Sequence, residues 1–273
     1  MKSSFSILVN TTDNFEDCWI PFFTLFKKYW PEFNGLIYLN TENKDFTFDN
    51  LNIISIKNNA SKSSWSECLR YALNYINEEH ILYLQEDYFL KSEVDSNAID
   101  SFFQLFSNNN FDCLHLTDQS TPGPFIKNTG IKGVWEVSKG ANYRLSTQAA
   151  FWKKDSLLKL IQNWENGWQF EHYGTKRSNY ILKKVMVIDS EKYGINKIEI
   201  LPYVFTGIIK GKWKNEVVDL FNSNNISIDF SMRGFSSDLN NYSLIKYNPN
   251  KITTYLNNLR SEINFIKLLI WQN

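Results

Sequence analysis

The stretch Ile81-Leu82-Tyr83-Leu84-Gln85-Glu86-Asp87 is the most informative part of the chain. Its apolar run predicts a buried strand, and the two carboxylates that follow at once then lie at the carboxyl end of that strand. Open α/β sheets bind their ligands at this edge. Adjacent carboxylates are costly unless a positive charge neutralises them, and a divalent cation such as Mg²⁺ or Mn²⁺ that carries phosphate suits their hard oxygens. The alternative is a strand that simply ends in solvated acids.

The segments around this strand alternate between strand and helix patterns. Strands appear as short apolar runs, and helices appear as apolar residues three and four positions apart. The pattern predicts strands at residues 5–9, 36–39, 53–56 and 111–116 and helices near residues 19–30, 65–76 and 99–106, the second of them behind the capping box Ser64-Trp65-Ser66-Glu67. This β-α-β-β-α-β-α-β order predicts an α/β fold with a mostly parallel central sheet flanked by helices.

The second half of the chain has a less regular pattern. Residues 117–140 combine several glycines and prolines with apolar side chains, which favours a binding loop. Beyond it we expect strands at residues 147–152, 185–188 and 198–201, a helix that Asp155 caps and that ends near Ile161, and helices near residues 214–221 and 251–271. No repeat and no linker rich in Pro, Gly or Ser divides the chain into independent domains.

The composition of the 273 residues narrows the class of protein. The formal net charge is +0, so no overall field attracts nucleic acid or an anionic membrane. The 3 cysteines, Cys18, Cys68 and Cys113, lie scattered in apolar stretches, and we expect buried, reduced thiols in a cytoplasmic protein. Aromatic residues reach 16%, which suits platforms that stack on sugars and equally suits an aromatic-rich core.

A second candidate site lies in the stretch Trp168-Gln169-Phe170-Glu171-His172. Apolar neighbours desolvate a carboxylate, and desolvation raises its pKa and makes it a usable general base. Glu171 is therefore a candidate base, with a surface acid or an ion pair to Lys176 or Arg177 as the alternatives. Glu165 competes for the role of base, although the residues after it favour an exposed turn.

Several basic side chains are candidates for binding a diphosphate. Lys212 follows a strand-like run, and Arg70, Arg144 and Arg233 are further candidates. Arginine binds phosphate oxygens in a bidentate way, whereas lysine acts as a point charge. The alternative for each of them is a solvated surface residue.

The order of elements, the Gln85-Glu86-Asp87 motif after the fourth strand and the later strand–helix–acid segment resemble those of GT-A fold glycosyltransferases. More narrowly, the chain resembles bacterial transferases that build surface polysaccharides such as O-antigen or capsule. The resemblance implies a GT-A-like, Rossmann-like catalytic domain at residues 1–215, with a donor half at 1–116 and an acceptor half at 117–215. A helical C-terminal extension at 216–273 would pack on it.

The resemblance also implies a site and a mechanism. In the family an Asp-x-Asp motif holds Mn²⁺ or Mg²⁺ against the diphosphate of a nucleotide-sugar donor. Here Asp87 would bind the divalent cation and Glu86 would help to bind it or orient the ribose, with Gln85 in the place of the first acid. Glu171 would be the base of an inverting, hexosyltransferase-like enzyme that glycosylates a glycan or lipid-linked acceptor, and His172 replaces the usual second acid. The expected donor-binding residues are Asn10, Thr11, Asp13, Trp65, Arg70, Glu86, Asp87 and Lys212, and the expected acceptor-binding residues are Trp135, Arg144, Trp168 and His172.

Two other functions fit the same residues. One is a metal-dependent phosphohydrolase or nucleotidyltransferase that uses Glu86 and Asp87, and the other is a non-catalytic glycan-binding protein. The last helix carries a broad apolar face that would pack on the domain or on a second subunit. A peripheral contact of this face with the inner side of a membrane, next to a lipid-linked acceptor, is the alternative.

Overall fold

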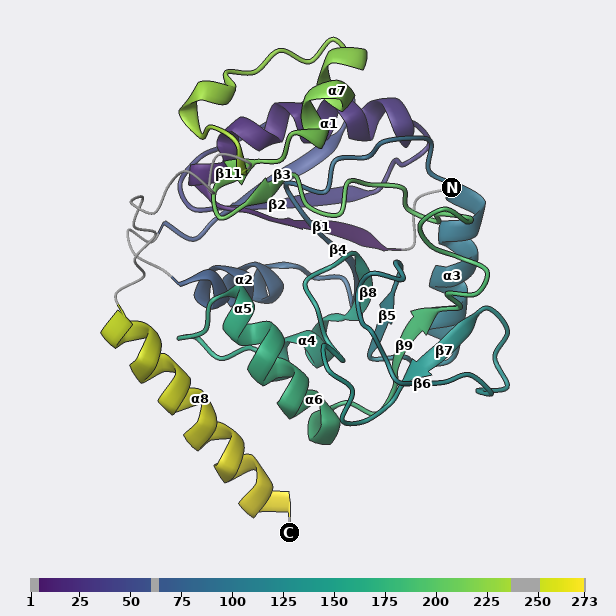
Figure 1. Ribbon diagram of the computed structural model, residues 1–273, viewed down its shortest axis with the longest axis vertical. Helices are drawn as coiled ribbons and strands as arrows, with labels where there is room; N and C mark the ends of the chain where they lie inside the picture. Colours follow the sequence, from purple (N-terminus) through teal and green to yellow (C-terminus); the bar gives the residue numbers. More distant parts are fainter. Residues whose placement is uncertain (1–4, 60–63, 237–250, 273) are drawn as a thin grey trace.

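The computed structural model describes residues 5–59, 64–236 and 251–272 (Figure 1). Within them, nine strands form one sheet: β1 (Ser6–Asn10), β2 (Leu36–Thr41), β3 (Asn52–Lys57), β4 (His80–Gln85), β5 (Cys113–His115), β6 (Phe125–Ile126), β7 (Val134–Val137), β8 (Ala150–Lys153) and β9 (Val185–Ile188). A separate hairpin consists of β10 (Ile208–Ile209) and β11 (Lys212–Trp213). The helices are α1 (Glu16–Tyr29), α2 (Trp65–Tyr75), α3 (Ser96–Asn108), α4 (Lys154–Leu160), α5 (Gly167–Gln169), α6 (Thr175–Ile181), α7 (Glu216–Ser223) and α8 (Lys251–Gln272).

The strands lie in the order β3-β2-β1-β4-β8-β5-β9-β7-β6. The first four are parallel to their neighbours, and β8 joins β4 to β5 as an antiparallel strand. β5 and β9 are again parallel, and β7 and β6 complete the edge as antiparallel strands. The expected α/β fold is confirmed: a parallel half carries the carboxylate pair, and the second half of the sheet is mixed.

Helices cover both faces of the sheet. Figure 1 shows α1 on one side and α2, α4 and α6 on the other. Aromatic side chains fill the space between the layers, since the ring of Phe5 lies 5.0 Å from those of both Phe103 and Phe151. Much of the aromatic excess therefore serves the core. The three cysteines are buried, as expected.

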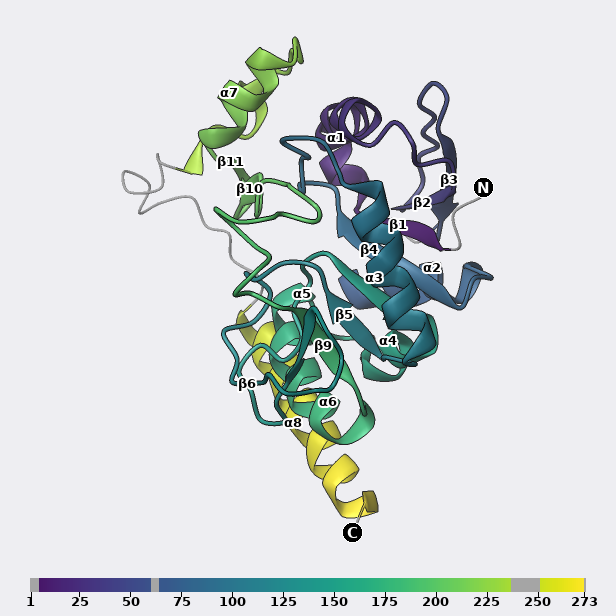
Figure 2. The ribbon, with the colours of Figure 1, turned by 90° about the vertical axis from the view of Figure 1, so that its right-hand side faces the viewer.

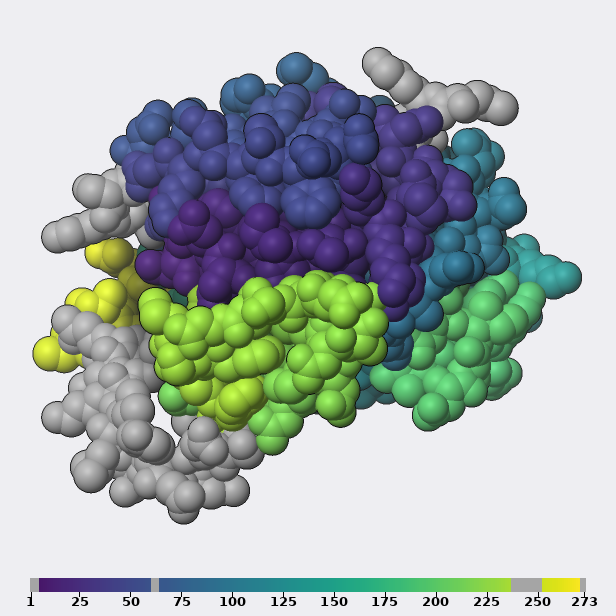
Figure 3. Space-filling view, turned by 90° about the horizontal axis from the view of Figure 1, so that it is seen from above, coloured from purple at the N-terminus to yellow at the C-terminus, as the bar shows by residue number. Residues whose placement is uncertain are grey.

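The described C-terminal part of the chain, from β11 onward, attaches to two different parts of the domain. The segment that includes β11 and α7 lies along α1, where Arg233 forms an ion pair with Asp17 at 2.6 Å. Figure 3 shows this yellow-green segment beside the purple N-terminal residues. The last helix, α8, runs alongside α5 and α6 in both ribbon views (Figures 1 and 2). No helix in the described ranges is both long and apolar enough to cross a membrane.

Three local predictions from the sequence are wrong. Residues 117–140 contain β6 and β7, so they extend the sheet instead of forming one loop. Residues 198–201 form no strand beyond a single bridge between Tyr193 and Ile198. The side chain of Asp155 does not cap α4, because Lys153 occupies the N-cap position and Asp155 lies in the first turn.

Candidate active site

The carboxylate pair lies at the carboxyl end of β4, next to the end of β1. The two strands are parallel, with Asn10 opposite Gln85, so the residues that follow them share one edge of the sheet. Glu86 is 7% exposed and Asp87 is 5% exposed. Both acids are therefore buried at the ligand-binding edge, and the solvated-acid alternative is wrong.

Asp87 is held by a segment more than a hundred residues away. Its Oδ2 atom accepts hydrogen bonds from Oγ1 of Thr206 at 2.6 Å and from the backbone N–H of Ile208 at 3.1 Å. The backbone N–H of Gly207 also donates to the carbonyl oxygen of Asp87 at 3.0 Å. The other carboxylate oxygen, Oδ1, is buried and has no hydrogen-bond partner among the described residues.

The charged form of Glu86 has no ion-pair partner among the described residues. Burial raises its pKa well above the usual range, the charge of Asp87 raises the pKa further, and the more distant Arg233 opposes the shift. The guanidinium of Arg233 is already engaged, since it donates to both carboxylate oxygens of Asp17 at 2.6 Å. Burial also raises the pKa of Asp87, against the effect of its bond with Thr206. No described cation forms an ion pair with either acid.

These features fit a hard divalent cation. The unpartnered Oδ1 atom of Asp87 and the carboxylate of Glu86 are oxygen donors that lack a positive partner. The described residues contain no cluster of three or more His, Cys, Asp or Glu side chains that could hold a metal ion. Mg²⁺-like ions commonly bind one or two carboxylates and take their other ligands from phosphates and water. Glu86 and Asp87 are therefore suited to a cation that arrives with a phosphate ligand.

The end of β1 and the turn after it hold the three residues expected to bind the nucleotide, and protein contacts engage all three side chains. Oδ1 of Asn10 accepts from Asn40 at 2.7 Å, and Oγ1 of Thr11 accepts from the indole of Trp19 at 3.0 Å. The carboxylate of Asp13 accepts from the backbone N–H groups of residues 42 and 43, both at 3.0 Å. These side chains shape the turn beside the carboxylate pair, and Asn10 and Thr11 are buried.

Glu171 lies in a π-helical turn, Phe170–Gly174, that joins α5 to α6. Such turns often occur at functional sites, because they displace a side chain from the regular helical position. Oε1 of Glu171 accepts from the backbone N–H of Thr147 at 2.7 Å and from its hydroxyl at 2.8 Å. Burial raises the pKa of Glu171, and the two bonds from Thr147 oppose the rise. The expected desolvation is confirmed.

A short chain of contacts connects Glu171 to the carboxylate pair. Tyr88, the residue after Asp87, donates its hydroxyl to the carbonyl oxygen of Thr147 at 2.8 Å, and Thr147 in turn holds Glu171. Tyr83 lies within electrostatic reach of both Glu86 and Glu171, since both raise its pKa in addition to the larger effect of burial. Two residues, Tyr88 and Thr147, thus link the two acidic sites.

The alternatives for Glu171 are not found. Glu165 pairs with Arg177 in a bidentate, fully buried ion pair at 2.7 and 2.5 Å, and Lys176 pairs with Glu262 at 2.7 Å. The expectation that Glu165 lies in an exposed turn is wrong, because this ion pair holds it in the interior. Glu171 is left as the acid of this segment without a cationic partner among the described side chains.

Three other predicted residues lie close to Glu171. Trp65 packs on Phe170 with ring centroids 5.4 Å apart and so supports the helix that carries the base. Trp168 and His172 are both exposed, Trp168 to 61%, and lie three positions before and one position after Glu171. A fourth predicted residue, Lys212, lies on a different element, β11, and donates to the carbonyl oxygen of Arg233 at 2.8 Å.

Three predicted residues lie away from the site. Arg70 donates to the side chain of Asn163 and to a backbone carbonyl in the same loop, so it ties α2 to that loop. Arg144 is fully buried and donates to the backbone oxygens of Val137 and Ser178. Trp135 is buried in β7, four strand positions or about 19 Å from β4. These three predictions are corrected, because the contacts of Arg70 and Arg144 and the buried place of Trp135 in β7 serve the loops and the core.

The sequence did not indicate the residues that hold the two acids in place. Thr206 and Gly207 interrupt an apolar run, which is a weak signal for a close backbone approach. Gly207 is needed there, because a Cβ atom would lie 2.3 Å from the ring of Phe89. Thr147 and Tyr83 carry no local signal, since their roles depend on contacts with distant segments.

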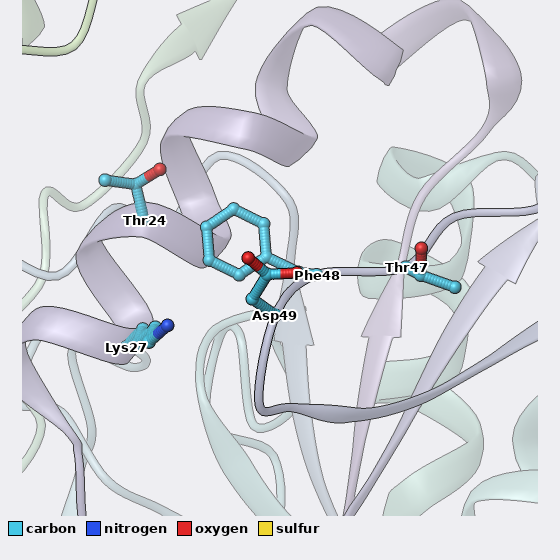
Figure 4. Close-up of a pocket in the computed structure, with 5 residues that line it drawn as sticks. All are labelled: Thr24, Lys27, Thr47, Phe48 and Asp49. Carbon is cyan, nitrogen blue, oxygen red and sulfur yellow. The ribbon is translucent and has the colours of Figure 1, made fainter.

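A depression of about 340 Å³ lies between α1 and the loop at residues 47–49, and Figure 4 shows its lining. The lining residues are Thr24, Lys27, Thr47, Phe48 and Asp49. None of the predicted site residues is among them, so this hollow is not part of the candidate active site.

No protein-family model matches the chain, and no curated protein matches it. Among solved structures, TarS of S. aureus aligns over 85% of this chain and 41% of its own length, with 14% identity and a TM-score of 0.48. TarS 1–349 in complex with UDP-GlcNAc aligns over 98% of this chain and 81% of its own, with 13% identity and a TM-score of 0.49. A UDP-glucose pyrophosphorylase complexed with UDP-glucose aligns over 82% and 98%, with 10% identity and a TM-score of 0.44. The chain spans about two fifths of the length of TarS.

Proposed function

We propose that the chain is a glycosyltransferase that moves a sugar from a nucleotide-diphosphate sugar to an acceptor hydroxyl, with inversion at the anomeric carbon. The observation that carries the proposal is the pairing of two unlike acidic sites. Among the described residues, no cation pairs with Glu86 or Asp87 at the carboxyl edge of the parallel strands, and Glu171, whose pKa burial raises, accepts hydrogen bonds there through Oε1 alone. This division suits a reaction that needs a diphosphate site and a separate base.

Glu171 is suited to take the proton of the acceptor. Oε1 is fixed by Thr147, so Oε2 is the atom that can accept the hydroxyl proton. A pKa that burial raises above its ordinary value makes the carboxylate a stronger base, and the deprotonated form is the active one. The rate is therefore expected to rise with pH through the raised pKa of Glu171.

Glu86 and Asp87 are suited to hold a Mg²⁺ or Mn²⁺ ion with the donor diphosphate. Such an ion, when bound, stabilises the charge that develops on the leaving nucleotide diphosphate. Thr206 fixes the orientation of Asp87. Lys212 and Arg233 lie on the adjoining C-terminal segment, and Arg233 already lowers the pKa of Glu86 from a distance. We place the donor between this segment and the end of β4.

The acceptor side is proposed around Trp168 and His172. An exposed indole near the base offers a flat apolar face on which a sugar ring can stack. A glycan or a lipid-linked sugar of a bacterial surface polysaccharide is the acceptor class that fits this proposal.

A transfer assay with UDP- and GDP-sugars tests the proposal. Incubation with and without a panel of acceptors separates sugar transfer from plain hydrolysis, the reaction expected of a phosphohydrolase. We expect Glu171→Gln to reduce turnover about 10²- to 10⁴-fold, the range for a general base, and to leave donor binding unchanged. Glu79→Gln is the matched control. Glu79 is exposed and directly precedes β4, so it lies at the end of the strand opposite to Glu86 and Asp87. A fully active Glu171→Gln enzyme would remove Glu171 as the base.

A further inference from the structure

The helix α8 presents two chemically different faces. One face binds the domain through polar contacts: the indole of Trp164 donates to the hydroxyl of Ser261 at 2.9 Å, and Asn257 donates to the carbonyl oxygen of Trp164 at 2.7 Å. Gln169 donates to Asn258 at 2.7 Å, and Ser261 is fully buried. The domain therefore already occupies the polar face of α8.

The other face is an apolar stripe that nothing in the described chain covers. It consists of Ile252, Leu256, Leu259, Ile263, Ile266 and Ile270, which are between 46% and 70% exposed. Of the two expected partners of the apolar face, the domain is wrong for these six residues, because the domain binds the opposite face of α8 through polar contacts and Phe265. Six large apolar side chains in contact with water along one helix are a considerable cost for a chain that stays alone.

The spacing of the stripe identifies what covers it. Successive members are 4, 3, 4, 3 and 4 positions apart, which is a strict repeat of 3.5 residues. This is the a/d seam of a coiled coil, with Leu256, Ile263 and Ile270 at a and the other three at d. A helix that lies on a membrane instead needs a wide apolar face opposite a polar face rich in Lys and Arg. On α8 the face opposite the stripe carries Asn, Ser and Phe265, which packs on Tyr180, and this face is bound to the domain.

The charges beside the seam favour one orientation. Arg260 and Lys267 fall at e positions, and Glu262 and Tyr255 fall at g positions. A parallel pair places each g residue near the e residue five positions on in the other helix, which joins Glu262 to the partner's Lys267. An antiparallel pair places the two e rows together, where Arg260 and Lys267 repel. Glu262 also binds Lys176 of its own chain, with 42% of its side chain still exposed.

We propose that α8 forms a parallel coiled coil with α8 of further copies of this chain. The seam covers three heptads in a helix of 22 residues, about 33 Å long. The occupant of the stripe is thus the same stripe of a second copy, and the catalytic domains lie on the outside of the assembly, each held by the polar face of its own helix. Isoleucine at d positions is compatible with a third copy.

The mass of the full chain in solution tests the proposal. The monomer has a mass of 32.2 kDa, and sedimentation equilibrium should give two or three times that value. Ile266→Asp should return the mass to that of the monomer with an unchanged circular dichroism spectrum. Ile20→Asp is the matched control, because Ile20 on α1 is 51% exposed, Ile266 is 52% exposed, and both receive the same change. The control should remain assembled.

Cysteine cross-linking tests the orientation separately. The native cysteines are buried, so mild oxidation should link only introduced ones. Ile252→Cys and Ile270→Cys lie at opposite ends of the seam, and in a parallel assembly each single variant should form disulfide-linked dimers. A chain that stays monomeric at about 100 µM, where an assembly with a dissociation constant of about 10 µM is mostly formed, would overturn the proposal. Monomeric chain that sediments with anionic phospholipid vesicles, and loses this binding in Ile266→Asp, would assign the stripe to a lipid surface and also overturn it.

Discussion

Glu86 and Asp87 are adjacent in sequence but differ in their hydrogen-bond partners. Thr206 and Ile208 satisfy one oxygen of Asp87, whereas no described side chain pairs with Glu86. Burial raises both pKa values, so the folded protein favours the protonated forms. For an acid with a raised pKa, the contribution to stability is full below the unfolded pKa and is lost as pH rises toward the folded one. At neutral pH the pair therefore destabilises the fold unless a cation is bound.

Glu86→Gln should therefore stabilise the protein at pH 7 in the absence of divalent cations. The substitution removes an ionisable group whose pKa is raised on folding, together with the cost of that shift at pH 7, and we expect the melting temperature to rise by about 2–4 °C for each 1 kcal/mol gained. The gain should shrink as the pH falls toward 4.5, where Glu86 becomes protonated in the unfolded state as well. Thermal melts at pH 5 and pH 7 with a chelator measure it, with Glu79→Gln as the exposed control. An unchanged or lower melting temperature at pH 7 would show that Glu86 is already compensated.

Local sequence patterns predicted the strand of the carboxylate site but missed the helical segment from α5 to α6. The apolar run of β4 and the two acids after it were predicted correctly, because a buried strand and its exit are local features. The helical segment from α5 to α6 was missed, because the buried ion pair of Glu165 and Arg177 places charged residues where a helical pattern expects apolar ones. The strands β6 and β7 have only two and four residues, too few for a periodic signal.

The segment at residues 204–208 is the element that fixes Asp87, and Gly207 allows it to approach. Gly207→Ala would place a Cβ atom 2.3 Å from the ring of Phe89 and 3.1 Å from the carbonyl oxygen of Asp87. We expect a loss of about 1–3 kcal/mol in the free energy of unfolding, the usual cost of overpacking, together with weaker donor binding as Thr206 moves. Urea unfolding monitored by tryptophan fluorescence measures the stability.

Gly167→Ala is the control for that substitution. A Cβ atom at Gly167, the first residue of α5, meets its nearest neighbour at an ordinary 3.6 Å. Its stability should stay within about 0.5 kcal/mol of the wild type or rise, since alanine favours a helix. Equal stability of the two variants would mean that the 204–208 segment yields freely and does not fix Asp87.

At the scale of the whole molecule, the candidate site depends on segments that are far apart in sequence. The end of β4 meets residues 206–208, Thr147 meets Glu171, and Arg233 meets Asp17. Sequence patterns predicted the two acidic centres, but the contacts that hold them are set by the packing of the whole chain. For the same reason Trp135, Arg144 and Arg70 could not be separated from site residues before the fold was known.

The most direct test of the account is the thermal stability of the wild type and of Asp87→Asn with nucleotide diphosphates and Mn²⁺. Asparagine keeps one oxygen for Thr206 and Ile208, so the variant should fold and lose mainly its affinity for the cation. We predict that UDP or GDP raises the melting temperature only when Mn²⁺ is present. When the nucleotide concentration is a hundredfold above the dissociation constant, the rise should correspond to about 2.7 kcal/mol in the free energy of unfolding. The rise should be absent in Asp87→Asn. An equal rise in both proteins, or one that needs no cation, would contradict the claim that this carboxylate pair holds a cation-bound diphosphate.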